Sequence, residues 1–409
     1  MKRLVIWMIS GFVLLLTSTA VFAEESTVSR EEINALREKL ERLEKAFEQQ
    51  AATDSKKEEE KRWYEKIEIA GGATAGVQGS AGAKKRHSRK GNVTDGTLSF
   101  DLEASLPLAE SGKFYFLTEA GTGNGIDGDL PTLSGFNDTA NEEDKLSLSE
   151  VWYEHTWFKE RLRFRAGKID LTTDFDTNAV ANCEKTQFLS GGFVNNLAVE
   201  FPDDNGIGAM IWFSLRDDLG FGVGFADADG DGDSLFDDVF SIAEIGFKPK
   251  IGECQGNYRF YGWLNNKDHA DLVDPDKTGE KNYGIGLSLD QEITDLLTLF
   301  ARYGWQRGSV SQIKHAWSAG LKCSGKFYGR QDDVIGLAYG MAIIGDDWEE
   351  TDRDSGIRSG NEHHVELYYN LKVHDHFRIS PDIQWVKNAN GDADNRDLWV
   401  FGVRARVAF

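Results

Sequence analysis

Arginines recur at alternate positions in several segments of the sequence, and their guanidinium groups could bind the hydroxyl or anionic groups of a solute. Arg163 and Arg165 lie two residues apart in "LRFRAGK", and Arg404 and Arg406 have the same spacing in the closing "VRARVAF". Successive side chains of a strand point to opposite faces, so arginines two residues apart share one face. The residues predicted to line one water-filled surface are Arg163, Arg165, Arg259, Arg302, Arg404 and Arg406.

Acceptor groups that could complement these arginines lie between residues 171 and 205. They are Asp174, Asp176, Asn178, Glu184 and Gln187. A sugar hydroxyl both donates and accepts hydrogen bonds, so arginines that face carboxylates across a narrow passage could replace its water shell. Trp152 or Trp263 could stack on the apolar face of a pyranose. The alternative for each arginine is a solvated wall residue that bridges to a neighbouring acid.

The acidic segment "DADGDGDSLFDD" resembles part of a calcium-binding loop. Its predicted ligands occupy positions 1, 3, 5 and 12 of the EF-hand pattern and are Asp227, Asp229, Asp231 and Asp238. Position 12 normally holds a glutamate, and no helical pattern flanks the segment. A solvated acidic turn is therefore the alternative, and we expect no other cofactor.

Two classes of function are disfavoured. The formal net charge is −22, which argues against nucleic acid as a partner. The sequence contains no Ser-His-Asp set with a nucleophile elbow, no HExxH motif and no phosphate-binding loop. We therefore expect no enzymatic activity, although an outer-membrane lipase with catalytic residues at its rim stays open as an alternative.

The elements that would position the arginines are strands with two different faces. In the closing "DLWVFGVRARVAF", Trp399 and Phe401 share one face, and Arg404 and Arg406 share the other. Seventeen alternating segments of this kind follow one another from Glu65 to the C-terminus. A soluble sheet would bury the aromatic face, whereas an outer-membrane barrel would present it to lipid and line a wet lumen with the arginines.

The lengths of the connections distinguish the two ends of such a barrel. Bacterial barrels have an even number of strands, long outer loops and short periplasmic turns. Counting from both ends places residues 121–145 outside and requires one segment near residue 200 not to cross. The shortest segment, "NLAVEFP", contains Pro202 and is that one. Sixteen strands remain, and we expect the long connection 171–205 to fold inward and narrow the channel.

The N-terminal region has a different pattern. Residues 1–23 carry Lys2 and Arg3 before an apolar run that ends in "VFA", which predicts a secretory signal peptide. Residues 28–50 predict a coiled-coil helix, because apolar residues recur at steps of three and four: Ile33, Leu36, Leu40, Leu43 and Phe47. Residues 51–64 are predicted to be a charged linker. The helix is either a dimer or trimer zipper or a solitary amphipathic helix on another surface.

The segment "RFRAGKIDLTTDFDTNAVANCEKTQFLSGGFVNN" resembles the bacterial outer-membrane carbohydrate-selective porin family, in which an "R-x-G-K" strand leads into a "D-x-N…QF" loop. "LFARYGWQRG" and the closing "RARVAF" are similar to the same family, so the resemblance covers residues 65–409. It implies a sixteen-stranded pore for passive sugar uptake. The N-terminal helix departs from the simplest members, and phosphate-selective porins can carry such a helix.

The sequence therefore predicts an all-β protein, with a sixteen-stranded antiparallel transmembrane β-barrel at residues 65–409. We expect it in the cell outer membrane, in contact with outer-membrane lipids, with the coiled-coil helix in the periplasm. The predicted solutes are small sugars, and a homotrimer could form through the barrel and the helix. The alternatives are an anion- or phosphate-selective porin and an outer-membrane envelope tether.

Overall fold

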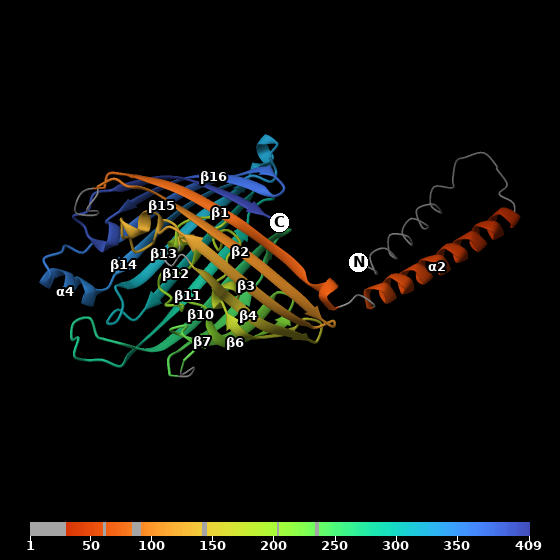
Figure 1. The fold of residues 1–409 in the computed structure, drawn as a ribbon, viewed down its shortest axis with the longest axis horizontal. Coiled ribbons are helices and arrows are strands. Elements are labelled where there is room, and N and C mark those ends of the chain that lie inside the picture. Colours follow the sequence, from red (N-terminus) through yellow and green to blue (C-terminus); the bar gives the residue numbers. More distant parts are fainter. Residues whose placement is uncertain (1–29, 60–62, 84–90, 141–144, 203, 234–236) are drawn as a thin grey trace. The chain divides into compact units, whose positions relative to one another are not determined.

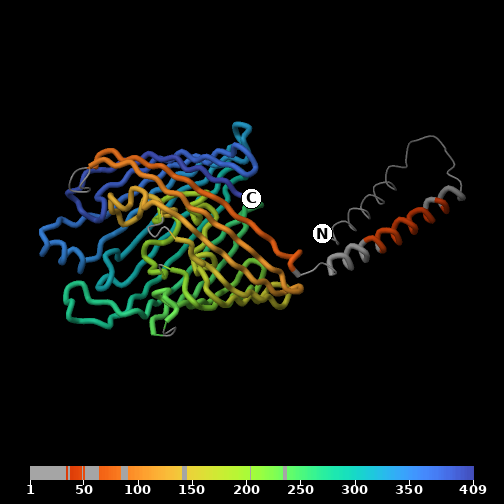
Figure 2. Tube along the Cα trace, viewed as in Figure 1, coloured from red at the N-terminus to blue at the C-terminus, as the bar shows by residue number. Residues whose placement is uncertain are grey.

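The structure is a computed structural model that describes residues 30–59, 63–83, 91–140, 145–202, 204–233 and 237–409 (Figure 1), and Figure 2 traces the path of the same chain. The chain divides into two compact units, Met1–Glu65 and Lys66–Phe409. The predicted signal peptide, residues 1–23, lies outside the described residues.

The second unit is a closed antiparallel barrel (Figure 1). Each strand pairs with the next, and β1 pairs with β17 to close the sheet, with Gly72 opposite Ala408. The two-residue β9 pairs only with the start of β10, so sixteen strands form the wall, as predicted. The strands are β1 (Glu68–Ala81), β2 (Thr94–Leu108), β3 (Gly112–Thr122), β4 (Leu146–Trp157), β5 (Leu162–Ile169), β6 (Gly206–Arg216), β7 (Leu219–Asp227), β8 (Val239–Phe247), β9 (Lys250–Ile251), β10 (Cys254–His269), β11 (Glu280–Glu292), β12 (Leu297–Gln306), β13 (Ile313–Ser324), β14 (Val334–Ile344), β15 (Glu362–His374), β16 (Phe377–Lys387) and β17 (Leu398–Ala408).

The two faces of the wall have opposite exposure to those of a soluble protein. On β17, Phe401 is 51% exposed, whereas Arg404 is 1% exposed. Large apolar side chains point outward along the other strands as well, as Phe100, Phe260 and Leu367 do. This pattern suits a barrel whose outer face meets hydrocarbon and whose inner face carries polar groups.

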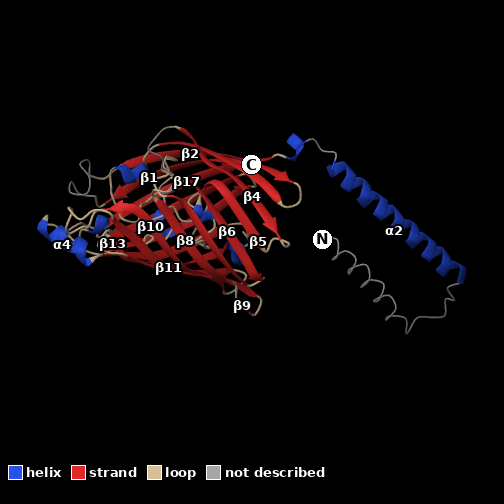
Figure 3. Ribbon diagram, turned by 90° about the horizontal axis from the view of Figure 1, so that it is seen from below, coloured by secondary structure: helices blue, strands red, loops and turns tan. Residues whose placement is uncertain are grey.

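Short helices lie in several of the connections between strands (Figure 3). The segment "NLAVEFP" forms no strand, in agreement with its exclusion from the count. The connection 170–205 contains η3 (Leu171–Thr173) and α3 (Gly191–Val194), and the other short helices are η1 (Trp63–Lys66), η2 (Gly125–Gly128), η4 (Gly325–Tyr328), α4 (Asp346–Asp354) and η5 (Ala389–Gly391).

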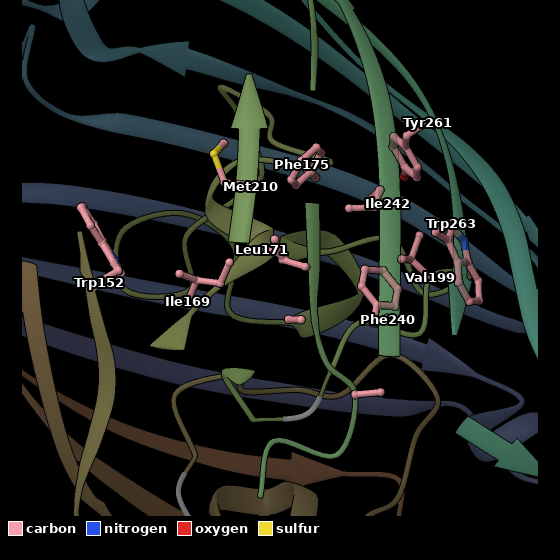
Figure 4. Close-up of a cluster of buried hydrophobic side chains, with 12 residues drawn as sticks. Trp152, Ile169, Leu171, Phe175, Val199, Met210, Phe240, Ile242, Tyr261 and Trp263 are labelled. Atoms are coloured by element: carbon pink, nitrogen blue, oxygen red, sulfur yellow. The ribbon is translucent and has the colours of Figure 1, made fainter. Parts of the chain in front are cut away.

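The connection 170–205 packs inside the barrel. Its Leu171 and Phe175 join a buried cluster with the wall residues Ile242, Tyr261 and Trp263 (Figure 4). Farther along, Phe188 and Phe193 pack against wall residues of β12, β14 and β15 in a second cluster. Burial of these aromatic side chains stabilises the inward position of the connection.

The connection between β3 and β4, which the strand count placed at the outer end of the barrel, also turns inward, and the sequence did not predict this turn. Ile126, Leu130 and Phe136 are fully buried against wall residues such as Val386 and Val400. The rule that outer loops are long and periplasmic turns are short predicts at which end of the barrel a connection lies. It does not tell whether apolar residues in the loop return into the lumen.

The first unit contains one long helix, α2 (Arg30–Glu59). The helix extends beyond the predicted residue 50, so most of the predicted linker 51–64 is helical. Alanine, lysine and glutamate dominate the added residues, and all three favour helix. Leu40, Leu43 and Phe47 are exposed along it. Among the described residues, no helix combines the length and the hydropathy needed to cross a bilayer.

Candidate functional site

Two arginines of β5 hold the start of the inward connection. Arg163 and Arg165 each donate a hydrogen bond to Asp174, at 2.6 and 2.7 Å, and Arg165 also pairs with Glu154 on β4 at 2.9 Å. Asp174 can approach them because Asp170 caps the short helix η3 by accepting from the Thr172 amide at 2.8 Å. The Asp174 carboxylate therefore fixes the loop to the wall, and the Asp170 carboxylate orders the loop around it.

The next loop residues are held across the lumen by β12. Arg302 donates from Nε to the Asp176 carboxylate at 3.1 Å and from its two terminal nitrogens to the carbonyl oxygens of Asp176 and Phe193. Tyr261 donates to the same carboxylate at 2.8 Å. The side chains of Arg302 and Asp176 are 2% and 0% exposed, so this ion pair is shielded from lumen water.

The far part of the connection is held by β15 and β17 through its backbone. Glu366 accepts from the amides of Leu189 and Ser190, at 2.5 and 3.0 Å. Arg404 donates to the carbonyl oxygens of Glu184 and Gln187, the latter at 2.9 Å. We call the side of the loop that Arg302, Glu366 and Arg404 contact the clamped face.

The β3–β4 connection is fixed to the same part of the lumen and to the first loop. Glu362 accepts from the amides of Leu133 and Ser134, both at 2.9 Å. The carbonyl oxygen of Ser134 in turn accepts from the Ser190 hydroxyl at 2.9 Å, and the Asp138 amide donates to the Leu189 carbonyl at 2.8 Å. The two inward connections therefore form one assembly that narrows the lumen.

A cavity of about 270 Å³ remains between this assembly and the wall formed by β2 to β5. Lys185, from the first loop, pairs with Glu119 on β3 at 3.0 Å and with Asp101 on β2 at 3.5 Å. The side chains of Lys185 and Glu119 are 21% and 35% exposed, so both stay in contact with lumen water. The charged residues that line the cavity are Glu119, Asp138, Lys168, Glu184, Lys185 and Asp204. We call this side of the loop assembly the open face.

The electrostatics of the open face reflect its partial enclosure. Enclosure in the barrel raises the pKa of Glu184, although Lys185 opposes that change. Enclosure alone would lower the pKa of Lys185, but the Glu119 carboxylate raises it instead. Enclosure and the nearby carboxylates of Glu184 and Asp127 raise the pKa of Asp138 to about 7. The open face therefore presents an ammonium group beside carboxylates whose charge depends on pH.

The family model described as carbohydrate-selective porin, OprB family, matches residues 85–409. The chain belongs to the OprB family of carbohydrate-selective porins. Among curated relatives, Porin AaxA of Chlamydia abortus is 22% identical over 286 residues, which cover 67% of this chain and 59% of the relative. Porin B of Pseudomonas aeruginosa is 23% identical over 202 residues, which cover 41% of this chain and 44% of that porin.

Solved structures support the OprB-type fold. The high-pH structure of Pseudomonas putida OprB has a TM-score of 0.76 at 17% identity, and the match covers 85% of this chain and 95% of that one. An anion-selective porin from Comamonas acidovorans has a TM-score of 0.53 at 13% identity, with coverage of 84% and 99%. At these identities the likeness concerns the fold alone.

The predicted arginines of this OprB-family chain fall into two groups. Arg163, Arg165, Arg302 and Arg404 contact the loop, although Arg404 does so through backbone carbonyl oxygens. Arg259 and Arg406 instead pair with wall residues, Glu244 at 2.8 Å and Asp101 at 3.0 Å. The hypothesis that wall arginines face loop carboxylates therefore holds for Arg163, Arg165 and Arg302 only, because Arg404 meets loop carbonyl oxygens and the other two pair with acids of the wall.

The predicted loop residues also differ in role. Asn178 donates to the Ser288 hydroxyl and the Leu289 carbonyl, both at 3.1 Å, and so fixes the loop to β11. Gln187 accepts from the Asn182 amide at 2.7 Å inside the loop. Of the predicted residues, Glu184 alone lines the open cavity. The other five charged lining residues were not predicted: Glu119, Asp138, Lys168, Lys185 and Asp204. The inward position of Glu119 in "GKFYFLTEAG" was the available signal.

The tryptophans predicted to stack on a sugar are covered by protein. The guanidinium carbon of Arg165 lies 4.1 Å from the ring centre of Trp152, and Tyr115 stacks on the same indole at 4.6 Å. Trp263 is 4% exposed and stacks on Phe240 at 6.0 Å. Neither indole presents a free face to the lumen of the OprB-type barrel.

The acidic turn after β7 gathers three of its four predicted calcium ligands. Oxygen atoms of Asp227, Asp229 and Asp231 lie within 4.8 Å of one another. The fourth residue, Asp238, uses its backbone carbonyl to accept from the Ala228 amide at 3.0 Å. The three carboxylates suit a hard cation such as calcium, and the proposed role of Asp238 stays a prediction.

Proposed function

We propose that this chain forms an outer-membrane channel for passive diffusion of small sugars, and that the solute passes along the open face. The observation that carries the proposal is the mixed chemistry of the cavity. Lys185 offers donors, and Glu119 and Glu184 offer acceptors, around the same space of about 270 Å³. A sugar hydroxyl can use both kinds of partner at once.

The size of the cavity favours single sugar rings. Sites for drug-sized ligands start at roughly 300 Å³, so the enclosed space fits one small solute at a time. The half-exposed Lys185–Glu119 pair can exchange its partners for solute hydroxyls without leaving a buried charge unpaired. Weak and reversible contacts of this kind allow release as well as entry.

The charges of the inner wall and the cavity favour a sugar channel over an anion- or phosphate-selective porin. Each of the six predicted arginines already donates to a carboxylate or carbonyl oxygen of the protein, as Arg302 does to Asp176. The cavity lining combines four acids with two lysines. An anion-selective filter would require unpaired cationic groups along the passage instead.

The helix α2 supports a second, separate proposal. Leu40, Leu43 and Phe47 are 50%, 67% and 72% exposed along a heptad-spaced face. We propose that this face pairs with other copies of the chain in the periplasm, as a homotrimer, while the barrel contacts outer-membrane lipids. An envelope-tethering role is the alternative. Oxidation of Leu43→Cys chains, with the three native cysteines replaced by serine, would give disulfide-linked dimers if helices pair, because one cysteine per chain can join only two chains. Arg42→Cys on the neighbouring face is the matched control, and light scattering of the detergent-solubilised wild type distinguishes a trimer from a dimer.

Liposome swelling tests the main proposal. Proteoliposomes are exposed to glucose, maltose or maltotriose at equal osmolarity, and we expect glucose to enter fastest and maltotriose slowest. Glu119→Gln should slow glucose entry because a carboxylate acceptor is lost from the cavity. Equal rates for all three sugars, or no glucose entry, would contradict the proposal. Block of chloride current by phosphate at low concentration would favour the anion-selective alternative.

A further inference from the structure

Trp212 lies on the inner face of β6, and its indole packs against glycines of the neighbouring strands. It pairs with Gly222 across β6 and β7, and its neighbours Ile211 and Phe213 point to the outer face. A Cβ added at Gly222 would lie 2.2 Å from Cε3 of the indole, and one at Gly220 would lie 2.8 Å from Nε1. A Cβ at Gly246 of β8 would lie 3.3 Å from the far edge of the ring.

These three glycines contact different parts of one indole. One face of the ring therefore packs against backbone that carries no side chains. Phe175 of the inward loop is the nearest aromatic ring, at 6.4 Å and tilted by 59°, so it is not stacked on Trp212. Trp212 is only partly buried. It touches the buried cluster that contains Phe175, but it is less buried than Trp152 and Trp263, so part of its second face is open to the lumen.

Polar groups border this indole in the same recess of the wall. Ser214, Asn257 and Arg259 line it together with Trp212, near the short turn that joins β6 and β7. Arg259 donates to Glu244 at 2.8 Å through one terminal nitrogen, and its side chain is 18% exposed. The guanidinium therefore keeps donor capacity beside an aromatic surface.

The recess is shallow rather than closed. Its enclosed part is about 30 Å³, which suits ordered water and is too small for a sugar ring. A solute would therefore lie over the indole, with one face on the aromatic ring and its edge toward the polar groups. That arrangement combines an apolar surface with a few placed polar groups, as ligand sites commonly do.

We propose that Trp212 is the platform of a second carbohydrate subsite, below the loop assembly at the short-turn end of the barrel. The proposal rests on the proposed function, because it assumes that sugars pass the open face. The apolar face of a monosaccharide ring stacks on the indole, and its hydroxyls bond to Arg259 and Asn257. Two weak sites in series let a solute advance in steps toward the periplasmic exit.

The test compares a ring sugar with an open-chain polyol. Planar-bilayer recordings give the concentration of glucose or sorbitol that half-blocks the ion current through the channel. We expect Trp212→Ala to raise the half-blocking concentration of glucose by roughly threefold to tenfold, with Trp212→Phe in between. Sorbitol, which has no ring face, should change by less than about twofold. Trp399→Ala, which removes an outward-facing indole, is the matched control.

The outcomes separate this proposal from the proposed function. If glucose enters wild-type proteoliposomes normally and Trp212→Ala leaves its half-blocking concentration unchanged, the platform is wrong and the sugar channel stands. If glucose does not enter the wild type, both proposals fail. Should Trp212→Ala not fold, Gly222→Ala supplies a second variant, since its Cβ displaces the indole from the wall, and it should weaken glucose block selectively.

Discussion

The two sides of the loop assembly use the same kinds of charged side chain for different purposes. On the clamped face, the side chains of Arg302 and Asp176 are 2% and 0% exposed. On the open face, those of Lys185 and Glu119 are 21% and 35% exposed. Charges that are sealed from water hold the constriction in place, and charges that remain wet can meet the solute.

The difference in exposure between the two faces affects how ion selectivity can be inferred from the sequence. A count of inward arginines alone would suggest an anion channel, because six are predicted on the inner wall. Carboxylates neutralise five of them, and Arg404 is buried against backbone carbonyl oxygens. The acids of the cavity lining therefore dominate the passage. The field felt by a permeating solute depends on the exposed charges, since buried pairs cancel at short range.

The largest effect is expected on the clamped face. Arg302→Met should leave Asp176 buried without its cation and cost roughly 3–5 kcal/mol of folding stability. The loop should then leave the wall, so single-channel conductance rises and maltotriose enters proteoliposomes. Arg216→Met is the matched control, because its pair with Asp218 in a turn has side chains 60% and 44% exposed.

A compensating change sharpens this prediction. In the double variant Arg302→Met with Asp176→Leu, no uncompensated charge is buried, and part of the lost stability should return. Heat-modifiability on gels measures barrel stability in both variants. If Arg302→Met keeps wild-type conductance and stability, the clamp does not depend on this ion pair.

An intermediate effect is expected on the open face. Lys185→Met removes a half-exposed cation, so stability should change by about 1 kcal/mol or less. The lining loses one of its two lysines, and the reversal potential in a potassium chloride gradient should move toward the potassium value. Glucose entry should change by about threefold, with Lys281→Met, on the outward face of β11, as the control. A loss of stability as large as that of Arg302→Met would erase the distinction between the two faces.

The barrel was predictable from the sequence because its signals are local. Alternation such as that in "LWVFGVRARV", together with connection lengths and Pro202, was enough to reach sixteen strands. The inward turn of the β3–β4 connection was not, because it depends on Glu362, which accepts from the Ser134 amide 228 residues away. No local pattern reports such a contact.

The site was only partly predictable for the same reason. The alternation of apolar and polar residues identified the inward arginines. It could not predict which of them the loop would bury and which would remain exposed to lumen water. Arg259 pairs with an acid on the adjacent strand β8, and Arg406 on β17 pairs with Asp101 on β2, across β1. Glu119 became important only because Lys185 lies opposite it. The exposure of a wall residue depends on where the loops pack, and that depends on tertiary contacts.

A smaller effect, reversible with pH, is expected from Asp138. Its pKa is raised to about 7, so its carboxyl group is mostly neutral below that pH and charged above it. The preference for potassium over chloride should therefore increase between pH 6 and pH 8. Reversal potentials measure this change, and Asp138→Asn should flatten it. A wild-type preference that does not vary over this range would show that Asp138 does not contribute to the field of the open face.

The smallest effect on the channel is expected from the acidic turn after β7, which belongs to neither face of the loop assembly. If Asp227, Asp229 and Asp231 bind calcium, the ion should stabilise the barrel by about 1.4 kcal/mol at ten times its dissociation constant. Asp229→Asn with Asp231→Asn should abolish this gain in heat-modifiability assays. Conductance and glucose entry should stay unchanged, because charges outside the passage are screened within about 10 Å at 0.1 M salt. A change in ion selectivity on adding calcium would mean that the turn acts on the passage after all. Solvent-exposed charges beyond the open face would then contribute to the electrostatic field that a permeating ion meets.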